Sequence, residues 1–295
     1  MTISAQIVAD SISPAGKRIT TMQLRYPRFI HAEAKTHRVI RIDDAEYEFL
    51  QEIGFMDDEK LSRNASSSRA IPVQKMIQDV IDDPAMPVAW GSNKPGMQAG
   101  EELAHWPVVK EVWLEARDAA VEFASEMMNL NAHKQIVNRL LEPFGHISVV
   151  VTATEWDNFF DLRCHEAADP TMRALAEAMR VAMDQSTPVE LLMGEWHLPY
   201  IPSHFVTHPA MPRDMDYWRE LAMISAAHCA RVSYLNHDGT SPDIEKDMAL
   251  ATMLRDMKHM SPFEHQARVT DEEGTALWGN LVGWDQFRKM IEVSA

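Results

Sequence analysis

The chain has 295 residues, a length that suits one large domain or two small ones. It carries 44 acidic residues against 28 Lys and Arg, which gives a formal net charge of -16 at pH 7. This acidity argues against nucleic-acid and anionic-membrane partners, because both need a positive field. It leaves room for a small anionic ligand where cations gather locally.

The sequence contains two cysteines, Cys164 and Cys229, without the spacing of a metal site or of a disulfide framework. The N-terminus has no charged start followed by an apolar run, so we expect no secretion signal. No stretch reaches the roughly 20 apolar residues that a membrane span needs. We therefore expect a cytoplasmic protein in a reducing compartment.

The first predicted elements lie within residues 19–84. Residues 19–30 begin with alternating apolar and polar positions, which predicts a strand, and a short helix is expected around residues 29–38. The acidic stretch 39–61 also carries apolar side chains, which favours an amphipathic surface helix over part of it. Residues 71–84 place apolar side chains at helical spacing and stop at Pro84, so they predict a further helix.

The middle of the chain is strongly helical. Residues 108–129 and 131–142 predict two helices, and "HISVVVTATEW" at 146–156 predicts the best strand after the first. Asp169 and Pro170 fit the cap and first position of another helix. Its buried stripe is predicted to contain Met172, Leu175, Met179 and Met183.

Residues 185–213 are rich in proline and predict an irregular segment. A helix is expected from about 214 to 229, and Ser241-Pro242 is expected to start another. The buried stripe of that last helix is predicted to contain Ile244, Met248, Ala251 and Leu254. Long helices with few strands predict an α+β fold, and no linker divides the chain, so we expect one domain over 1–295.

The stretch "SRNASSSR" at residues 62–69 concentrates cations, hydroxyls and an amide in an acidic chain. Ser, Asn and Arg together can cradle a phosphate, since Arg offers a fixed fork of donors and hydroxyls fill the remaining acceptors. The alternative is a polar loop that caps the helix starting near Ile71, because Ser is a favoured cap. The residues alone leave both readings open.

Three other clusters draw attention. Arg163 ends "TATEWDNFFDLR" and is either a buried anion ligand or, as arginines more often are, a surface ion-pair residue. His259 and His265 in "HMSPFEH" lie six positions apart with Pro262 between them, which does not place both on one helical face, so we expect no metal site. His197 in "GEWHLPY" is expected to pack among aromatic rings with its own ring hydrogen-bonded.

Together these clusters resemble one family. "HR" at 37–38 followed by S-x-N-x-x-S-x-R resembles the signature R-H-R-x-x-S-x-N-E-x-S-x-R of the flavin-dependent thymidylate synthases, the ThyX type. "ARVSY" at 230–234, "HMSPFEH" at 259–265 and "NFFDLR" at 158–163 resemble other blocks of that family. "SRNASSSRAIP" and "VVTATEWDNFF" are similar to a phage-type branch, which would place the protein in a host cytoplasm.

The order of the blocks departs from the common form, in which "ARVSY" and "SPFEH" come before the signature. The sequence therefore resembles a circular permutant of the family. The first Arg of the signature is Thr36, its Glu is Ala65, and residues 39–61 form an insertion where the family has two residues.

The resemblance assigns roles to particular residues. Ser67 and Arg69 match the residues that bind the phosphate of deoxyuridine monophosphate (dUMP), Arg139 matches another nucleotide-binding arginine, and Arg163 matches the arginine that closes on the uracil. Arg163 is thereby implied to be catalytic. The positions matching contacts to flavin adenine dinucleotide (FAD) are His37, Arg38, Asn64, Asn158, Ser233, His259 and Ser261.

The resemblance implies a ThyX-like α+β fold with a small mixed sheet, assembled as a homotetramer with shared sites. The implied reaction is reductive methylation of dUMP to dTMP, with carbon from methylenetetrahydrofolate and hydride from NADPH through FAD. One alternative is a related transferase that makes a modified, for example hydroxymethylated, pyrimidine nucleotide. Another is a flavin- or nucleotide-binding protein without turnover. The permuted order also predicts that Arg268–Thr270 and Thr20–Met22 lie in the same sheet region.

Overall fold

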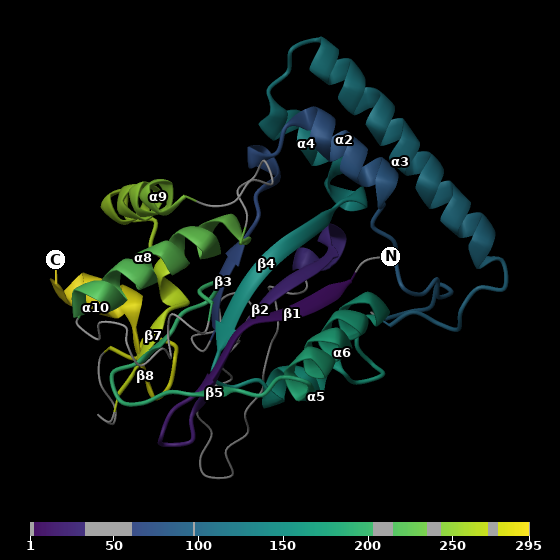
Figure 1. The fold of residues 1–295 in the computed structure, drawn as a ribbon. Helices are drawn as coiled ribbons and strands as arrows, with labels where there is room; N and C mark the ends of the chain where they lie inside the picture. The colour runs from purple at the N-terminus through teal and green to yellow at the C-terminus, as the bar shows by residue number, and fades with distance from the viewer. Residues whose placement is uncertain are drawn as a thin grey trace, which may run out of the picture.

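The computed structural model describes residues 3–32, 61–96, 98–202, 215–234, 243–270 and 277–294. Its centre is a five-stranded mixed sheet in the order β3-β4-β2-β1-β5 (Figure 1). The strands are β1 (Ser4–Ile12), β2 (Arg18–Pro27), β3 (Leu61–Ala65), β4 (His146–Ala153) and β5 (Val189–Glu190). β4 lies between β2 and β3 and is antiparallel to both, which carries the "SRNASSSR" stretch directly onto the sheet.

One face of the sheet is apolar because side chains alternate along each strand. Met22 and Leu24 of β2 pack with Val149 and Val151 of β4 in one core. Two helices, α5 (Asp157–Arg163) and α6 (Pro170–Asp184), cover this face and appear together at the lower right of Figure 1.

The opposite face meets the C-terminal part of the chain. The elements there are α8 (Met215–Arg231), α9 (Ile244–Asp256), the 3-10 turn η4 (Ser261–Glu264) and α10 (Phe287–Ser294), with a three-stranded sheet of β6 (Trp196–His197), β7 (Ala267–Val269) and β8 (Trp284–Gln286). Trp196, Phe263 and Trp284 fill their shared core. These elements lie to the left of the central sheet in Figure 1.

A third layer of helices stands beyond the end of β3 and the start of β4. It consists of α2 (Val73–Asp82), α3 (Trp106–Asn129) and α4 (Lys134–Leu141), with the 3-10 turns η2 (Ser68–Ala70) and η3 (Glu142–Phe144) at its base. Val73, Val80, Val137 and Leu141 are buried between these helices.

The helices predicted from apolar spacing are confirmed at α2, α3, α4, α6 and α8, and the strand at 146–156 is confirmed as β4, although it ends at Ala153. The predicted cap of α6 is also confirmed. The carboxylate of Asp169 accepts hydrogen bonds from the backbone N–H groups of Thr171 and Met172, each at 2.9 Å. These bonds satisfy two N–H groups that the first helical turn otherwise leaves without partners.

Three expectations need correction. The strand predicted within residues 19–30 is β2, and the sequence pattern missed β1, which precedes it in the chain. Helix α9 is capped by Asp243, and Ile244 is 63% exposed and no part of a buried stripe. Arg28–Ile30 forms a short 3-10 turn. The expected helices at 29–38 and 39–61 lie mostly outside the described residues.

The predicted proximity of Arg268–Thr270 to Thr20–Met22 is wrong as a shared sheet, because β7 and β2 belong to different sheets. The two sheets are nevertheless neighbours. Ile19 at the start of β2 packs in the same core as Val269 of β7. Within the described part of the chain, no helix has both the length and the apolar character to cross a membrane.

Candidate active site

The face of the central sheet that lies away from α5 and α6 is polar next to the helical layer. Gln23 and Arg25 alternate with the buried Met22 and Leu24 on β2, so they point to the other side of the sheet. On β4, Ser148 lies directly opposite Arg25 in the strand register. Polar side chains on a covered sheet face are uncommon and mark a candidate binding surface.

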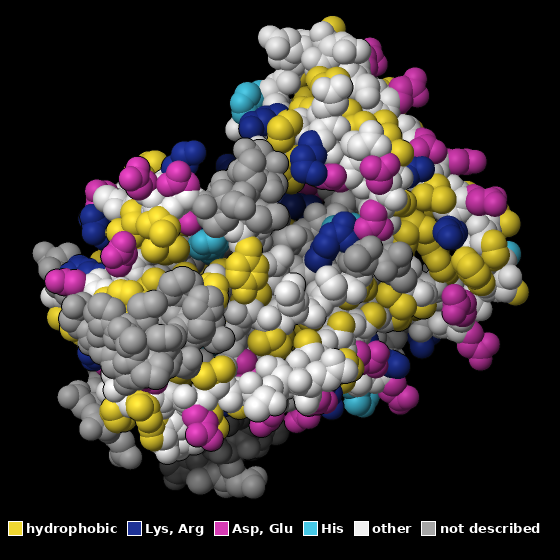
Figure 2. All heavy atoms as spheres, in the orientation of Figure 1, with side chains coloured by type: hydrophobic (Ala, Val, Ile, Leu, Met, Phe, Trp, Pro, Cys, Tyr) yellow, Lys and Arg dark blue, Asp and Glu magenta, His cyan; other side chains and the backbone are white. Residues whose placement is uncertain are grey.

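A pocket of about 520 Å³ opens over this polar face, a size typical of small-molecule sites. Its wall unites segments that are far apart in the chain: Ser66 and Ser67 from "SRNASSSR", and Arg231–Ser233 from "ARVSY". The remaining polar lining comes from β2, α2 and β4, namely Gln23, Arg25, Lys75, Asp79, Asp82, Asp83, His146 and Ser148. In Figure 2, Lys and Arg side chains gather where the layer of α2 and α4 meets the rest of the molecule.

The serines of the motif do not cap α2, so that reading is wrong. Pro72 occupies the cap position of α2, without a side-chain cap hydrogen bond, while Leu61–Ala65 forms β3. The Ser66 hydroxyl instead accepts a hydrogen bond from the backbone N–H of Ser148 at 3.1 Å. This contact continues the pairing of β3 with β4 and leaves Ser67 exposed at the pocket.

Most cations of the pocket wall are already paired with carboxylates. Arg25 lies 2.9 Å from Asp83, and Lys75 lies 3.0 Å from Asp79. Arg69 does not line the pocket itself, although Ser67 and Ala70 on either side of it in the chain do, and it is exposed with no carboxylate partner among the residues that the structure describes. Its guanidinium is therefore available to an incoming anion.

The part of the pocket wall that comes from "ARVSY" is held in place by a buried polar cluster between α8 and α9. The Asp247 carboxylate lies 2.7 Å from the Arg231 guanidinium and 3.2 Å from His228 Nε2. His228 Nδ1 lies 3.1 Å from the carbonyl oxygen of Ser233. Val232 between them has φ 56°, a left-handed conformation that a β-branched residue adopts only under strain. The cluster thus fixes Ser233 in the pocket wall.

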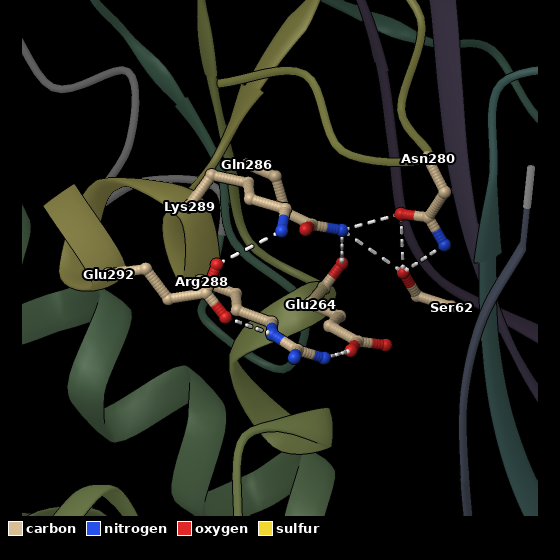
Figure 3. A network of polar contacts seen from close by, with 7 residues as sticks. All are labelled: Ser62, Glu264, Asn280, Gln286, Arg288, Lys289 and Glu292. Carbon is tan, nitrogen blue, oxygen red and sulfur yellow. Dashed lines mark hydrogen bonds and ion pairs between the residues drawn. The ribbon is translucent and has the colours of Figure 1, made fainter. Parts of the chain in front are cut away.

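Strand β3, which contains the start of "SRNASSSR", is also hydrogen-bonded to residues near the C-terminus (Figure 3). The buried Gln286 side chain donates from Nε2 to the Ser62 hydroxyl at 3.3 Å and to the Glu264 carbonyl at 3.2 Å. Asn280 Nδ2 donates to the same hydroxyl at 3.0 Å. Arg288 pairs with the Glu264 carboxylate and with Glu292. One amide therefore links β3, which carries Asn64, to η4, which carries Ser261.

A chain of hydroxyls and imidazoles joins the two sheets. His197 lies within 2.9 Å of the Ser11 hydroxyl and 2.8 Å of the Thr21 hydroxyl, which confirms that its ring is hydrogen-bonded. Its ring also packs edge-on against Trp284. Thr152 connects Thr21 to His265, at 2.6 Å and 2.8 Å. Complete burial lowers the pKa of both His197 and His265 to about 3, so both rings are neutral at pH 7.

The structure brings some of the candidate residues together and separates others. Ser67 and Ser233 line the pocket. Asn64 lies on β3 nearby, with its side-chain nitrogen 3.5 Å from the Cys229 carbonyl. Arg69 lies in η2 and Arg139 on α4, two elements joined by the Asn138 amide, which donates to the Ser68 carbonyl at 2.8 Å.

The other candidates lie elsewhere. His259 and Ser261 are exposed next to and within η4. Asn158 and Arg163 lie on α5, across the central sheet from the pocket. His37 and Arg38, with Thr36, lie outside the described residues.

Sequence reasoning missed the pocket residues Gln23, Arg25, Lys75 and His146. The alternation of β2 carried a signal for the first two, since a polar residue stood between buried ones at each position. Lys75 and His146 gave no such signal. Within the described ranges, no three His, Cys, Asp or Glu side chains form a group suited to a metal ion.

Neither thiol is activated for nucleophilic attack. Burial raises the pKa of Cys164, where nearby Arg180 opposes the effect, and burial raises the pKa of Cys229 as well. We predict that the double variant Cys164→Ser, Cys229→Ser keeps most of the parent's activity in the nucleotide methylation that the sequence resemblance implies. Turnover assays on folded protein measure this. Complete loss in such a sample would show that a cysteine takes part in the reaction.

The fold and the pocket define an α+β protein with a polar, ligand-sized site on one face of a mixed sheet. The chain belongs to the family of the thymidylate synthase complementing protein, Thy1, whose sequence model matches residues 12–189, more than half of the chain. The match covers β2, β3 and β4 of the central sheet and "SRNASSSR" but ends before "ARVSY" and "HMSPFEH".

Solved structures similar to this chain include two of the UMP/dUMP methylase PolB from Streptomyces cacaoi, each 15% identical to it. The structure bound with 5-Br UMP has a TM-score of 0.41 and is matched over 62% of this chain and 89% of its own. The one bound with 5-Br dUMP has a TM-score of 0.44, with 62% and 90% covered. No curated protein matches the sequence significantly.

Proposed function

We propose that the protein is a flavin-dependent thymidylate synthase, which reductively methylates dUMP to dTMP with methylenetetrahydrofolate and NADPH as co-substrates. The observation that carries the proposal is that one pocket is lined by both the N-terminal and the C-terminal part of the chain. Family membership rests on the N-terminal part of the chain, yet the pocket wall also contains Arg231–Ser233 from a C-terminal block that resembles the same family. Two independent resemblances thus meet at one site.

The phosphate of dUMP is proposed to bind at the end of the motif. Ser67 is exposed at the pocket and offers a hydroxyl, and Arg69 follows it with a guanidinium that no described carboxylate occupies. A guanidinium matches phosphate oxygens with paired, charge-assisted hydrogen bonds. Arg139 on the adjoining α4 adds a second cation at this end. These charges offset the acidic whole and admit a dianion locally.

The described residues fit a bound flavin in part. Asn64, Ser233 and Ser261 offer amide and hydroxyl groups on elements that the Gln286 bridge and the Asp247 cluster hold in place. FAD, when bound, would supply the hydride chemistry that amino-acid side chains lack. The chain's own contribution is to position the nucleotide and to stabilise charge. Arg163 is proposed to stabilise negative charge that develops on the uracil.

We infer that a second copy of the chain completes each site, in a homotetramer. Arg163 and Asn158 lie on α5, which covers the apolar face of the sheet, while the pocket lies on the other face. Within one chain the sheet therefore separates them from the pocket. A neighbouring copy can present its own α5 to the pocket without any change of fold.

We propose that residues 1–295 form one catalytic domain with permuted block order. The hydrogen bonds from Asn280 and Gln286 to Ser62 support this, because they place C-terminal residues directly against strand β3.

A changed product, such as a hydroxymethylated nucleotide, is the second candidate function, favoured by Thr36, Ala65 and the insertion at 39–61. Mass spectrometry of the product separates the two. A protein that binds flavin without turnover would hold FAD and resist reduction by NADPH.

We predict that the purified full-length protein is yellow, or binds FAD when it is added, because four separate blocks match flavin-contact positions. Isothermal titration calorimetry with FAD measures the binding. A variant with Ser233 and Asn64 both changed to Ala should bind FAD more weakly, whereas the Arg173→Ala variant, whose substitution lies on α6 away from the pocket, should bind it like the parent. Folded parent protein that gives no heat with FAD would contradict the assignment.

A further inference from the structure

Gln23 lines the pocket, and the oxygen and the nitrogen of its carboxamide differ in their hydrogen bonding. The carboxamide oxygen accepts a hydrogen bond of 2.9 Å from the Tyr200 hydroxyl. Within the described part of the chain, the carboxamide nitrogen has no hydrogen-bond partner, although Gln23 lines the pocket. The acceptor of this amide is therefore occupied, and its two N–H donors are left for a ligand.

Tyr200 is built to hold that orientation. It is only 2% exposed, and its backbone has φ 64°, an unusual conformation for a bulky residue. Its ring stacks on His228 at 6.0 Å and meets Tyr234 edge-on at 4.8 Å. Burial also raises the pKa of the Tyr200 phenol, so the hydroxyl keeps its proton and acts as the donor. Strained residues of this kind persist where the surroundings fix them, often at ligand sites.

The register of the sheet places Gln23 toward one end of the pocket. Asn64 on β3 pairs with Val150 on β4, and Val150 pairs with Gln23 on β2, so these residues form one row on the same face. Neighbouring strands lie about 4.8 Å apart, which puts Asn64 and Gln23 roughly 10 Å from each other. Ser67 lies further along the chain, past the end of β3.

We propose that Gln23 is a specificity-determining residue whose carboxamide donates a hydrogen bond to a carbonyl oxygen of the pyrimidine base, with Tyr200 as its positioning residue. This inference rests on the proposed function, which supplies the nucleotide. A donor with its acceptor already satisfied favours a ligand that presents acceptors, and uracil presents two carbonyl oxygens. The phosphate, which is also an acceptor, is assigned to the other end of the pocket at Ser67 and Arg69.

The test compares two ligands in full-length, FAD-loaded protein by calorimetry. dUMP carries the base, and deoxyribose 5-phosphate carries the same sugar and phosphate without it. The Gln23→Leu variant is expected to bind dUMP about five- to tenfold more weakly, the loss of one neutral hydrogen bond, and to bind deoxyribose 5-phosphate like the parent. Gln6→Leu is the matched control, because Gln6 lies opposite Gln23 on β1 and does not line the pocket.

The Tyr200→Phe variant tests the positioning role. Alone it should weaken dUMP binding by a smaller factor, because the amide is then free to turn. Added to Gln23→Leu it should change dUMP binding no further, a non-additivity that a purely structural effect would not produce. This double variant also leaves no buried hydroxyl without an acceptor, so it guards against misfolding of the single Leu variant.

The outcomes separate the inference from the proposed function. A parent that does not bind dUMP overturns both. A parent that binds dUMP while Gln23→Leu binds it equally well overturns the inference alone. Equal losses for dUMP and deoxyribose 5-phosphate show that Gln23 binds phosphate, which also overturns it. Fully additive effects of the two substitutions overturn the role of Tyr200.

Discussion

Lowering the pH from 7.5 to 5.5 is expected to reduce the free energy of unfolding by about 3 kcal/mol through His197 and His265 alone. Both rings are fully buried, and burial lowers the pKa of each to about 3 in the folded protein. In the unfolded chain a histidine titrates near 6.5. Below that pH the unfolded state therefore takes up protons that the folded state does not.

The sign follows from this difference in proton binding. The stability contributed by each neutral, buried imidazole is fully present above pH 6.5 and is lost as the pH falls from 6.5 toward 3. The loss is about 1.4 kcal/mol per pH unit for each ring. Burial also lowers the pKa of His146, to about 4, so this ring acts in the same direction.

Urea denaturation at a series of pH values measures the effect. The His197→Gln variant keeps hydrogen-bonding capacity toward the Ser11 and Thr21 hydroxyls but does not titrate. It should be less stable at pH 7.5 and should lose less stability than the parent on acidification, by about 1.4 kcal/mol per pH unit. An unchanged pH slope in this variant would show that the His197 ring is not held neutral.

Removing either of two arginines is expected to weaken dUMP binding strongly while FAD binding stays mostly intact. Arg69→Ala and Arg163→Ala would each remove a proposed charge-assisted hydrogen bond to dUMP, worth on the order of 1.5–3 kcal/mol, or roughly 10- to 150-fold in Kd. The physical reasons differ. Arg69 lies next to the pocket of its own chain, whereas Arg163 is proposed to reach the pocket of a neighbouring copy.

Calorimetry with dUMP on FAD-loaded protein measures both losses, and Arg173→Ala is the control. Arg173 pairs with Glu177 on the outside of α6, at 2.8 Å, and has no proposed ligand.

The proposal that sites are shared between subunits has a test of its own. Mixed oligomers of Arg69→Ala and Arg163→Ala chains should regain some intact sites. If both single variants bind dUMP like the parent, the roles transferred to these positions are wrong.

The sequence predicted the helices better than the strands, for identifiable reasons. α6 has a strong cap at Asp169 and an apolar stripe, so local signals agree with the final fold. The sequence pattern missed β1 (Ser4–Ile12) because polar and apolar residues do not alternate regularly along it. Its buried Asp10 is explained only by the ion pair with Arg18, whose guanidinium lies 2.7 Å from the carboxylate. A pair across a hairpin, eight positions apart in the chain, leaves no periodic trace in the sequence.

The candidate site shows the same division. Ser67 and Ser233 were named from motif resemblance, and the structure places both in the pocket. Gln23 was not named, because its role depends on Tyr200, which lies 177 positions away in the chain. The serines of 66–68 resembled a helix cap because capping is a local preference. The pairing of β3 with β4 overrides that preference.

The most direct test of the proposed thymidylate synthase is a single anaerobic experiment on the full-length, FAD-loaded protein. NADPH is added first, and flavin absorbance is followed; dUMP and methylenetetrahydrofolate are then added, and the nucleotide product is identified by mass spectrometry. The account predicts bleaching of the flavin by NADPH, followed by return of its colour and formation of dTMP. A flavin that NADPH does not reduce, or a reduced flavin that leaves dUMP unchanged, would contradict it.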